Sequence, residues 1–351
     1  MLRANIEGTV KQLTEETELL LIDDCSTNNS GEVCREYAEK YDRVRYVNMG
    51  KNGGLSCVRN RTVDEAAGEW VFFADGDDLL SDHFVSTALG FLDTKYDIII
   101  HDRLKFTETI ESDEPCTVSK LIELPEGAGR ELGLSCLCLD PQIAKKFDLP
   151  SRAFYHAAWG AVYRKNFLVD NALTFPEGQK KAQDSVFNTK AYFHAKNVAY
   201  LPYVMYFYRS NLQGITRRYN SDLPAVSKSL LGHLHNCIDA LYKNDAGVEE
   251  SYMQHRVLAV VVDNMRLHFF HKDNKNSRED REKEFLEFID TEPYKTAIAA
   301  YDPKKSGRWE WHLPITLIQK KNFDKLDKIV ANDNKFNKLC GIDKRIAKLF
   351  K

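Results

Sequence analysis

Residues 70–78 read Trp-Val-Phe-Phe-Ala-Asp-Gly-Asp-Asp, and this stretch decides how the rest of the chain is interpreted. The first four residues are apolar, which is the length and composition of a buried strand. Such a strand delivers the carboxylates of Asp75, Asp77 and Asp78 to one edge of a sheet. Crowded carboxylates repel one another unless a cation compensates them, and their oxygens suit Mg²⁺ or Mn²⁺. The alternative is an ordinary polar turn, because Asp and Gly are common turn residues.

The composition is that of a globular protein with a hydrophobic core. The chain has 351 residues, 43% of them hydrophobic and 29% charged, which is long enough for two or three domains of ordinary size. A formal net charge of -3, with no basic stripe and interleaved aromatics in the first two-thirds, argues against nucleic acid as a partner. No run of about 18 apolar residues is present, so we predict no transmembrane helix.

The cysteine pattern favours a reducing compartment. Eight cysteines are scattered along the chain, none in a Cys-x-x-Cys pair, and no histidine spacing completes a zinc site. The residues after Met1 resemble neither a signal peptide nor a transit peptide. We therefore expect free thiols and a cytoplasmic protein.

Upstream of the acidic motif, apolar runs alternate with helical patterns. The run at 19–22 ends at Asp23 and Asp24, and the loop at 26–30 can cap the next helix. We predict helices at 2–14, about 30–41 and 56–67, and strands at 19–22, 44–47, 70–73 and 96–100. This alternation predicts a parallel α/β sheet, in which ligands lie outside the carboxyl ends of the strands. Both acidic segments fall at such ends, which describes a pocket for a nucleotide diphosphate and a metal.

The pattern changes further along the chain. We predict an extended hairpin or loop at 107–130, a region dense in aromatic residues at 151–220, and helices from about 222. Residues 257–267 carry the clearest apolar stripe, and the highly charged residues 272–284 are expected to form a solvated connection.

Four stretches, in order, resemble the motifs of one enzyme family. They are Leu-Ile-Asp-Asp-Cys-Ser-Thr at 21–27, Asn-Gly-Gly-Leu-Ser with a following Arg-Asn at 52–60, Asp-Gly-Asp at 75–77, and the segment from Phe175 through Gln183-Asp184 to Phe187. Together they resemble inverting glycosyltransferases of family 2, which have the GT-A nucleotide-diphospho-sugar fold. The resemblance covers about residues 2–220.

The resemblance implies a fold and a domain organisation. The fold class is α/β, with a GT-A Rossmann-like, mostly parallel sheet, flanking helices and a C-terminal helical region. The implied domains are a GT-A domain at 1–220, with a nucleotide-binding half at about 1–102 and an acceptor half at about 103–220, and a helical region at 221–351.

The resemblance also implies the donor site. It assigns Asp24 to the nucleotide base, Asp75 to the neighbourhood of the ribose, and Asp77 to a divalent metal, Mn²⁺ or Mg²⁺, with Asp75 beside it. The full set of implied donor-binding residues is Asp23, Asp24, Ser26, Asn52, Gly53, Arg59 and Asp75. For Arg59 the alternative is a structural ion pair with an aspartate.

The resemblance places the general base at Asp184. The family usually has Glu-Asp at this point, whereas this chain has Gln183 before Asp184, which alters the charge beside the base. The alternative for Asp184 is a helix N-cap, because Asp-Ser-Val-Phe-Asn is a reasonable helix start.

Aromatic and basic residues of the second half supply candidates for the acceptor and the phosphates. We assign Trp159 and Gln183 to acceptor binding, since a tryptophan ring can stack on the C–H face of a sugar. A buried core role for Trp159 is the alternative. Arg209, with Tyr206 and Tyr208, is a weaker candidate to close over the donor phosphates.

The chain departs from the family at its start. Family members normally begin with one more strand, whereas Met1 already lies in the helix that follows that strand. In a doubly wound sheet the first strand is central, so its absence leaves the neighbouring strands without ladder partners. We expect either a truncated or misassigned start, or the loss of part of the donor site.

The sequence therefore predicts a glycosyltransferase of hexosyl- or N-acetylhexosaminyl-transferring type. It would move a sugar from a nucleotide-diphosphate donor, a UDP-sugar, to a saccharide or lipid-linked glycan acceptor. The alternative is a non-catalytic or truncated GT-A-like protein that binds nucleotide-sugars or serves in assembly. A nucleotidyltransferase is disfavoured, because no glycine-rich phosphate loop with a basic residue is evident near the N-terminus.

The basic tail at 334–351 allows two interpretations. One is a packed terminal helix with a solvated face, and the other is peripheral docking on anionic lipid at the inner face of a membrane, where a lipid-linked acceptor would be presented.

Overall fold

The computed structural model describes residues 1–351 apart from 93, 109, 111–112, 211–217, 244 and 331–351. These residues form two compact units. The first comprises Met1–Cys136 and Ile143–Asn211, and the second comprises Leu137–Gln142 and Leu212–Lys351. The boundary near 211 lies close to the predicted one at 220, but a short segment from the middle of the chain is counted with the second unit.

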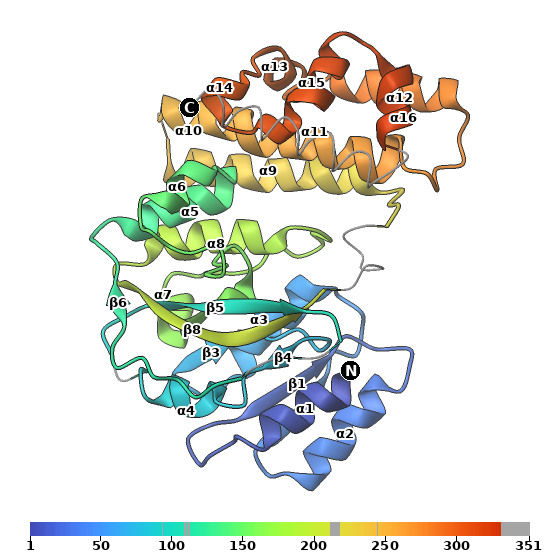
Figure 1. The fold of residues 1–351 in the computed structure, drawn as a ribbon. Helices are drawn as coiled ribbons and strands as arrows, with labels where there is room; N and C mark the ends of the chain where they lie inside the picture. The colour runs from blue at the N-terminus through green and yellow to red at the C-terminus, as the bar shows by residue number, and fades with distance from the viewer. Residues whose placement is uncertain (93, 109, 111–112, 211–217, 244, 331–351) are drawn as a thin grey trace. The chain divides into compact units, whose positions relative to one another are not determined.

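The first unit is a mixed α/β fold (Figure 1). Its elements in chain order are α1 (Leu2–Val10), β1 (Leu19–Asp23), α2 (Ser30–Lys40), β2 (Val44–Asn48), α3 (Leu55–Glu65), β3 (Trp70–Phe72), β4 (Leu79–Leu80), α4 (Phe84–Leu89), β5 (Ile98–Phe106), β6 (Ile122–Glu123), α5 (Ala128–Cys138), α6 (Pro141–Lys145), η1 (Ala158–Gly160), β7 (Ala161–Arg164), α7 (Lys165–Asp170), α8 (Gln183–His194) and β8 (Val198–Arg209). The predicted strands are present, although β5 runs on to Phe106. The predicted helix at 2–14 was too long, because α1 ends at Val10.

The central sheet has the strand order β3-β7-β5-β8-β4, with β6 added on β8. Its longest ladder is parallel, β5 with β8, and pairs nine residues of β5. The antiparallel pairings contain two or three residue pairs each. Strands β3, β5 and β8 thus run in one direction, and β4 and β7 run against them. The predicted fold class, α/β with a mostly parallel sheet and flanking helices, is confirmed.

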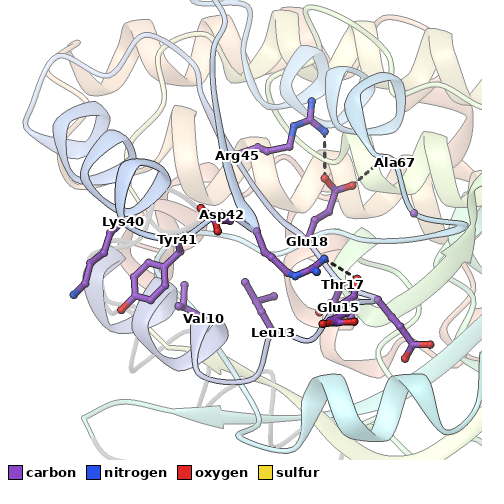
Figure 2. Close-up of a pocket in the computed structure, with 13 residues that line it drawn as sticks. Val10, Leu13, Glu15, Thr17, Glu18, Lys40, Tyr41, Asp42, Arg45 and Ala67 are labelled. Atoms are coloured by element: carbon purple, nitrogen blue, oxygen red, sulfur yellow. Dashed lines mark hydrogen bonds and ion pairs between the residues drawn. The ribbon is translucent and has the colours of Figure 1, made fainter.

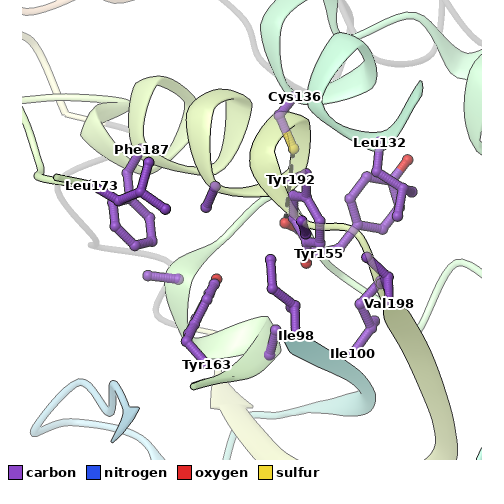
Figure 3. Packing of buried hydrophobic residues seen from close by; sticks show 14 of the residues in the cluster. Ile98, Ile100, Leu132, Cys136, Tyr155, Tyr163, Leu173, Phe187, Tyr192 and Val198 are labelled. Carbon is purple, nitrogen blue, oxygen red and sulfur yellow. Dashed lines mark hydrogen bonds between the residues drawn. The ribbon is translucent and has the colours of Figure 1, made fainter. Parts of the chain in front are cut away.

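Both faces of this sheet are buried at the start of β5, which explains the continuous apolar run of Ile98, Ile99 and Ile100. Successive side chains of a strand point to opposite faces. Accordingly Ile98 and Ile100 pack in one hydrophobic cluster with Phe187 and Tyr192 of α8, whereas Ile99 packs in a second cluster with Phe84 of α4. Figure 3 shows the first cluster, in which side chains of α5, α8 and β7 meet those of β5. The continuous apolar run is the signature of a strand covered on both sides.

Strands β1 and β2 form a separate parallel sheet of two strands. Among the described residues, no ladder joins β1 to β3. A cavity of about 810 Å³ lies between them, and its walls include Leu19–Ile22 of β1 and Trp70–Phe72 of β3. Side chains of α1, α3 and α4 line the rest of the cavity.

A second, open pocket lies at the other end of β1 (Figure 2). Its wall includes residues 15–18, which immediately precede β1, so it lies at the amino end of that strand and not at the acidic end. Arg45 pairs there with Glu18 and Glu65, and the Ala67 N–H donates to Glu18. These charged groups already bind one another, so we place no site in this pocket.

The second unit is helical. Its elements are α9 (Leu223–Leu241), α10 (Ala246–Ser251), η3 (Tyr252–Val257), α11 (Leu258–Asn264), η4 (Met265–Phe269), α12 (Arg278–Ile289), α13 (Tyr294–Ala299), α14 (Pro303–Ser306), η5 (Trp309–Trp311), α15 (His312–Gln319) and α16 (Phe323–Val330). Most of the predicted stripe at 257–267 is buried. The predicted connection at 272–284 was wrong in its second half, because Ser277 accepts a hydrogen bond from the Asp280 N–H and caps α12 there.

Within the described part of the chain, no helix has both the length and the apolar composition needed to cross a membrane. The seven cysteines of that part are all free thiols. The basic tail at 334–351 lies outside the described residues.

Candidate active site

The acidic turn after β1 holds the loop that leads into α3. The Asp24 carboxylate accepts hydrogen bonds from the backbone N–H groups of Gly53 (2.7 Å) and Gly54 (2.8 Å), and Asn52 Nδ2 donates to the Asp24 carbonyl (2.8 Å). Gly54 has a φ of 82°, a left-handed conformation that favours glycine, and it directly precedes α3. Asp24 therefore fixes the start of α3. Its contact with a nucleotide base stays a prediction.

Asp23 is the buried member of the same turn, with 7% of its surface exposed. Its carboxylate accepts hydrogen bonds from the Ser26 N–H (2.9 Å), the Tyr46 hydroxyl (3.2 Å) and Asn48 Nδ2 (3.3 Å). Burial acts to raise the pKa of Asp23, but these hydrogen bonds outweigh it and hold the pKa below its usual range. Gly31 is required nearby, because a Cβ there would lie 2.7 Å from Asp23 Oδ2. Asp23 thus orders the turn, and the Ser26 side chain remains exposed.

Arg59 joins the β3 turn to α8. Its side chain is 4% exposed, and its NH2 group lies 3.0 Å from Asp75 Oδ1 while its NH1 group binds Asp184 Oδ1. Burial acts to lower the pKa of Arg59, but the charges of Asp184 and Asp75 outweigh it and raise the pKa. Burial also raises the pKa of Asp75, and Arg59 offsets only part of this effect. The structural ion pair is therefore the arrangement that the structure shows for Arg59.

The β3 turn contains one free carboxylate and one buried carboxylate. Asp77 is exposed, and no described residue donates a hydrogen bond to its carboxylate, although its carbonyl accepts one from Arg209 Nε (2.8 Å). Asp78 is 2% exposed, and its carboxylate accepts from the Tyr206 hydroxyl (2.6 Å) and the Arg209 N–H (2.7 Å). Burial raises the pKa of Asp78 to about 6. Asp78 therefore anchors the turn on β8, which leaves Asp77 available to a ligand.

Sequence reasoning did not single out this anchoring role of Asp78. One signal was present, because the apolar pair Leu79-Leu80 follows it directly and forms β4. A carboxylate at the start of a strand is placed beside the neighbouring strand, and β4 pairs with β8 at Tyr206. The partner Tyr206, 128 residues away, could not be read from the sequence.

Asp184 lies in the first turn of α8. Its Oδ2 atom accepts a hydrogen bond from the Ala158 N–H (3.2 Å). The N-cap residue of α8 is Ala182, with no side-chain cap, so the N-cap alternative for Asp184 was wrong. A carboxylate in the first turn is still favoured by the helix dipole. Gln183, the first residue of α8, is 8% exposed, and its acceptor role stays a prediction.

Trp159 is packed among aromatic side chains. It is 5% exposed and stacks on Tyr206 (ring centroids 4.7 Å apart, planes at 8°) and on Phe154 (5.5 Å). The Arg103 guanidinium lies over the Phe154 ring at 4.3 Å. This burial favours the core alternative for Trp159. Its contact with an acceptor sugar would need an exposed part of the ring and stays a prediction.

Arg209, at the end of β8, lies beside the acidic motif. In addition to its bonds with the β3 turn, its guanidinium carbon lies 4.4 Å from the centre of the Phe106 ring. This position is compatible with the predicted contact to donor phosphates, which stays a prediction.

The site fits a divalent cation that arrives with a substrate diphosphate. Among the described residues, no three Asp, Glu, His or Cys side chains are grouped as a ready-made metal site. Mg²⁺ and similar ions instead bind through one or two carboxylates together with phosphate oxygens and water. Asp77 supplies one free carboxylate, and Asp75 is 31% exposed and lies two residues away. Asp77, with Asp75 beside it, would hold such an ion.

Solved structures share the overall fold of this chain. The crystal structure of Staphylococcus aureus TarS 1–349 matches with a TM-score of 0.57 and 20% identity, over 94% of this chain and 86% of that one. The same protein in complex with UDP-GlcNAc matches with a TM-score of 0.59 over the same shares. The fold of this chain is therefore of the GT-A class.

The sequence comparisons point to the same class. Residues 1–166, just under half of the chain, match the family described as Glycosyl transferase family 2. That part of the chain is therefore similar to this family.

Curated relatives of the chain carry similar names. The putative glycosyltransferase EpsH of Bacillus subtilis is 25% identical over 224 residues, which are 63% of this chain and 60% of that protein. The uncharacterized glycosyltransferase YibD of Escherichia coli is 29% identical over 226 residues, 63% of this chain and 62% of that protein. The poly(ribitol-phosphate) beta-N-acetylglucosaminyltransferase TarS of Staphylococcus aureus is 26% identical over 57% of this chain and 31% of its own length. The matched region thus spans less than two thirds of each relative.

Proposed function

We propose that this protein is an inverting glycosyltransferase that moves a sugar from a UDP-sugar to a saccharide or lipid-linked glycan acceptor. Three observations support the proposal: the similarity of residues 1–166 to glycosyl transferase family 2, the GT-A fold, and the carboxylates of Asp75 and Asp184 that meet at Arg59. The name of the TarS relative makes UDP-N-acetylglucosamine the first donor to test.

In the proposed reaction, an acceptor hydroxyl oxygen attacks the anomeric carbon of the donor sugar. A new carbon–oxygen bond forms on one face while the bond to the diphosphate breaks on the other, so the configuration is inverted. Asp184 accepts the proton that the hydroxyl loses. Both Asp184 oxygens already accept one hydrogen bond each, but a carboxylate has about four lone-pair positions, so it can still take a proton.

The diphosphate leaves with an increasing negative charge. A divalent cation, when bound, neutralises that charge. Asp77 would hold the cation, and Asp75, at the rim of the same turn, would contact the donor ribose. Asp24, Asn52 and Gly53 support this turn from the other side through the start of α3.

The observation that carries the proposal is the shared guanidinium of Arg59. Asp184 and Asp75 each touch one of its two terminal nitrogens, so the candidate base and the donor motif lie on either side of a single side chain. These residues come from two elements 109 positions apart in the sequence, Asp75 after β3 and Asp184 in α8. Inverting transfer needs such a base close to the donor sugar.

The test is a transfer assay with a matched control. The purified protein is supplied with UDP-N-acetylglucosamine or other UDP-sugars, Mn²⁺ and saccharide acceptors, and the release of UDP is measured with and without EDTA. The proposal expects metal-dependent release that disappears in Asp184→Asn and Asp77→Asn and persists in Asp82→Asn. Asp82 is an exposed carboxylate close to the motif, so it controls for the loss of one charge. Release that is equally fast in all three variants would contradict the proposal.

The alternative is a non-catalytic protein that binds nucleotide-sugars or serves in assembly. One observation favours it, namely the cavity between β1 and β3, whose lining includes Arg59 and Asp75. In that case UDP would raise the melting temperature of the protein, because a ligand stabilises the state that binds it, while no donor would be turned over. Peripheral docking of the tail at 334–351 on anionic lipid also stays a proposal. Loss of liposome binding on deletion of that tail would support it, and unchanged binding would exclude it.

A further inference from the structure

Arg59 belongs to a pair of neighbouring residues on α3 that hold the segment carrying Asp184. The next residue, Asn60, binds the backbone of Phe175 twice: its Nδ2 donates to the carbonyl (3.1 Å) and its Oδ1 accepts from the N–H (2.8 Å). The Phe175 ring lies under the Arg59 guanidinium at 5.4 Å. It also stacks on Phe187 of α8, with ring centroids 3.9 Å apart and planes at 7°. Helix α3 thus binds the segment 175–187 at two places, at Phe175 through Asn60 and at Asp184 through Arg59.

The Arg59 side chain is almost fully buried, so little of its guanidinium is open to a donor phosphate. Its two terminal nitrogens are engaged by two different carboxylates, and 4% of the side chain is exposed. Removing one partner of a buried ion pair is costly, because the remaining charge stays without compensation. The geometry therefore argues against the predicted role of Arg59 as a direct donor ligand.

We propose that Arg59 is a positioning residue, which holds the base carboxylate of Asp184 at a fixed place beside the donor motif at Asp75. This inference rests on the proposed function. A guanidinium suits the task because it is planar and presents several N–H donors in a rigid fork, so it can reach two carboxylates at once. A lysine ammonium is a compact charge that cannot span both in the same way. Asn60 fixes the same segment through its backbone.

Kinetics of Arg59 variants separate positioning from donor binding. In Arg59→Lys and Arg59→Gln, we expect kcat to fall about 100-fold, the typical cost of displacing a catalytic group by about 1 Å. The KM for the donor and the Kd for UDP, measured by calorimetry, should stay close to the wild-type values. In Arg59→Ala, added guanidinium ion should restore part of kcat. Arg61→Gln is the matched control, since Arg61 lies on the same helix and pairs with Glu65 at an exposed position.

The opposite pattern would overturn the inference. If Arg59→Lys and Arg59→Gln weaken UDP binding by about tenfold or more, a change of about 1.4 kcal/mol, while kcat is retained, then Arg59 is a donor ligand. Positioning would also be contradicted if guanidinium ion failed to rescue Arg59→Ala and the Arg59 variants had the same kcat as Arg61→Gln.

A stability measurement keeps the inference testable if the proposed function fails. Should the wild type transfer no sugar, the melting temperatures of Arg59→Gln, Asp184→Asn and the double variant are compared. If the two side chains interact, Arg59→Gln alone already removes that interaction. The melting temperature of the double variant should therefore be no lower than that of Arg59→Gln. Additive lowering would show that the two side chains act independently, and the positioning role would be rejected.

Discussion

Two acidic turns lie at strand ends in this fold, and they use their carboxylates differently. In the turn after β1, Asp23 accepts from one backbone N–H and two side chains, and Asp24 accepts from the N–H groups of Gly53 and Gly54. In the turn after β3, Asp78 is equally well bonded, but Asp77 points its carboxylate at no described donor. Clustered carboxylates at a strand end are therefore not by themselves a ligand site.

This difference indicates which carboxylate is available to bind a cation and which carboxylates order the turn. Carboxylates that already accept backbone and hydroxyl hydrogen bonds order the turn, because their lone pairs are in use. An exposed carboxylate held in place by an ordered turn is ready for a cation. By this criterion Asp77 is the metal candidate, and Asp23, Asp24 and Asp78 support the edge on which it lies.

The largest expected effect is at Asp184, which Arg59 joins to the turn after β3. In Asp184→Asn, the group that accepts the proton of the acceptor is lost, and we expect kcat to fall about 1000-fold. UDP binding should be unchanged, because no donor contact is removed. Initial transfer rates and calorimetry with UDP check this. A variant that retains more than half of the wild-type kcat would remove Asp184 from the mechanism.

Buried His101, which belongs to neither acidic turn, is expected to make the stability of the protein depend on pH. It lies on β5 with 1% of its surface exposed, and burial lowers its pKa to about 4. Between pH 6.5 and 4 the unfolded chain therefore binds a proton that the folded chain does not, so stability falls as the pH is lowered. The loss amounts to about 3 kcal/mol at pH 4.

Urea unfolding of His101→Gln between pH 4 and 7 measures this contribution. The variant should show a flatter decline in the free energy of unfolding than the wild type, whereas the partly exposed control His83→Gln should follow the wild type. Identical slopes for wild type and His101→Gln would show that His101 is not the source of the acid sensitivity.

At Asp77 we expect a loss of rate without a loss of stability. Because its carboxylate is exposed and binds no described residue, Asp77→Asn should unfold like the wild type. Removing one group that stabilises charge on the leaving diphosphate should lower kcat about 100-fold. Transfer rates at saturating Mn²⁺ and a thermal melt check both parts. Reduced stability with an unchanged rate would make Asp77 a structural residue like Asp78.

At Asp24 we expect the reverse. Asp24→Ala leaves two backbone N–H groups at the start of α3 without their acceptor, so the free energy of unfolding should fall by about 2 kcal/mol. Asp42→Ala, at an exposed carboxylate, is the control. Equal stability of the two variants would mean that the hydrogen bonds to Gly53 and Gly54 contribute nothing measurable.

The smallest expected effect concerns the cavity between the strands that carry the two turns. From a rise of ~3.3 Å, a strand spacing of ~4.8 Å and a layer spacing of ~10 Å, one strand residue fills about 160 Å³. The cavity of about 810 Å³ is therefore large enough for several residues of an extended strand. Leu2, which lines the cavity, comes within 3.3 Å of a Cβ built on Gly76, so α1 begins beside the β3 turn.

A designed apolar strand fused ahead of Met1 should raise the melting temperature, because it would pair with the open edges of β1 and β3. A fused Gly/Ser segment of equal length is the control, since it cannot fill the cavity with apolar side chains. Equal melting temperatures for the two fusions would show that the cavity does not accept a strand.

Local signals in the sequence were enough to predict the strand ends. The apolar runs before Asp23 and Asp75, and the glycine at the start of α3, depend on neighbours within a few residues. The fold class followed from the same alternation of strands and helices. The resemblance then supplied Asp184 as the candidate base.

Long-range partners could not be predicted. The bridge from Arg59 to Asp184 spans 125 residues, and no local pattern marks it. The same holds for the burial of Trp159, which depends on rings contributed by β8, and for the bond from Tyr206 to Asp78. The sequence offered an ion pair as an alternative for Arg59, but the identity of its partners required the packed structure.

The most direct test of the account is the binding of Mn²⁺ in the presence of UDP, followed by electron paramagnetic resonance of the free ion. We predict that wild type and the exposed control Asp82→Asn remove Mn²⁺ from solution when UDP is present, and that Asp77→Asn does not. If Asp77→Asn binds Mn²⁺ as well as the wild type, the assignment of the metal to the turn after β3 is contradicted.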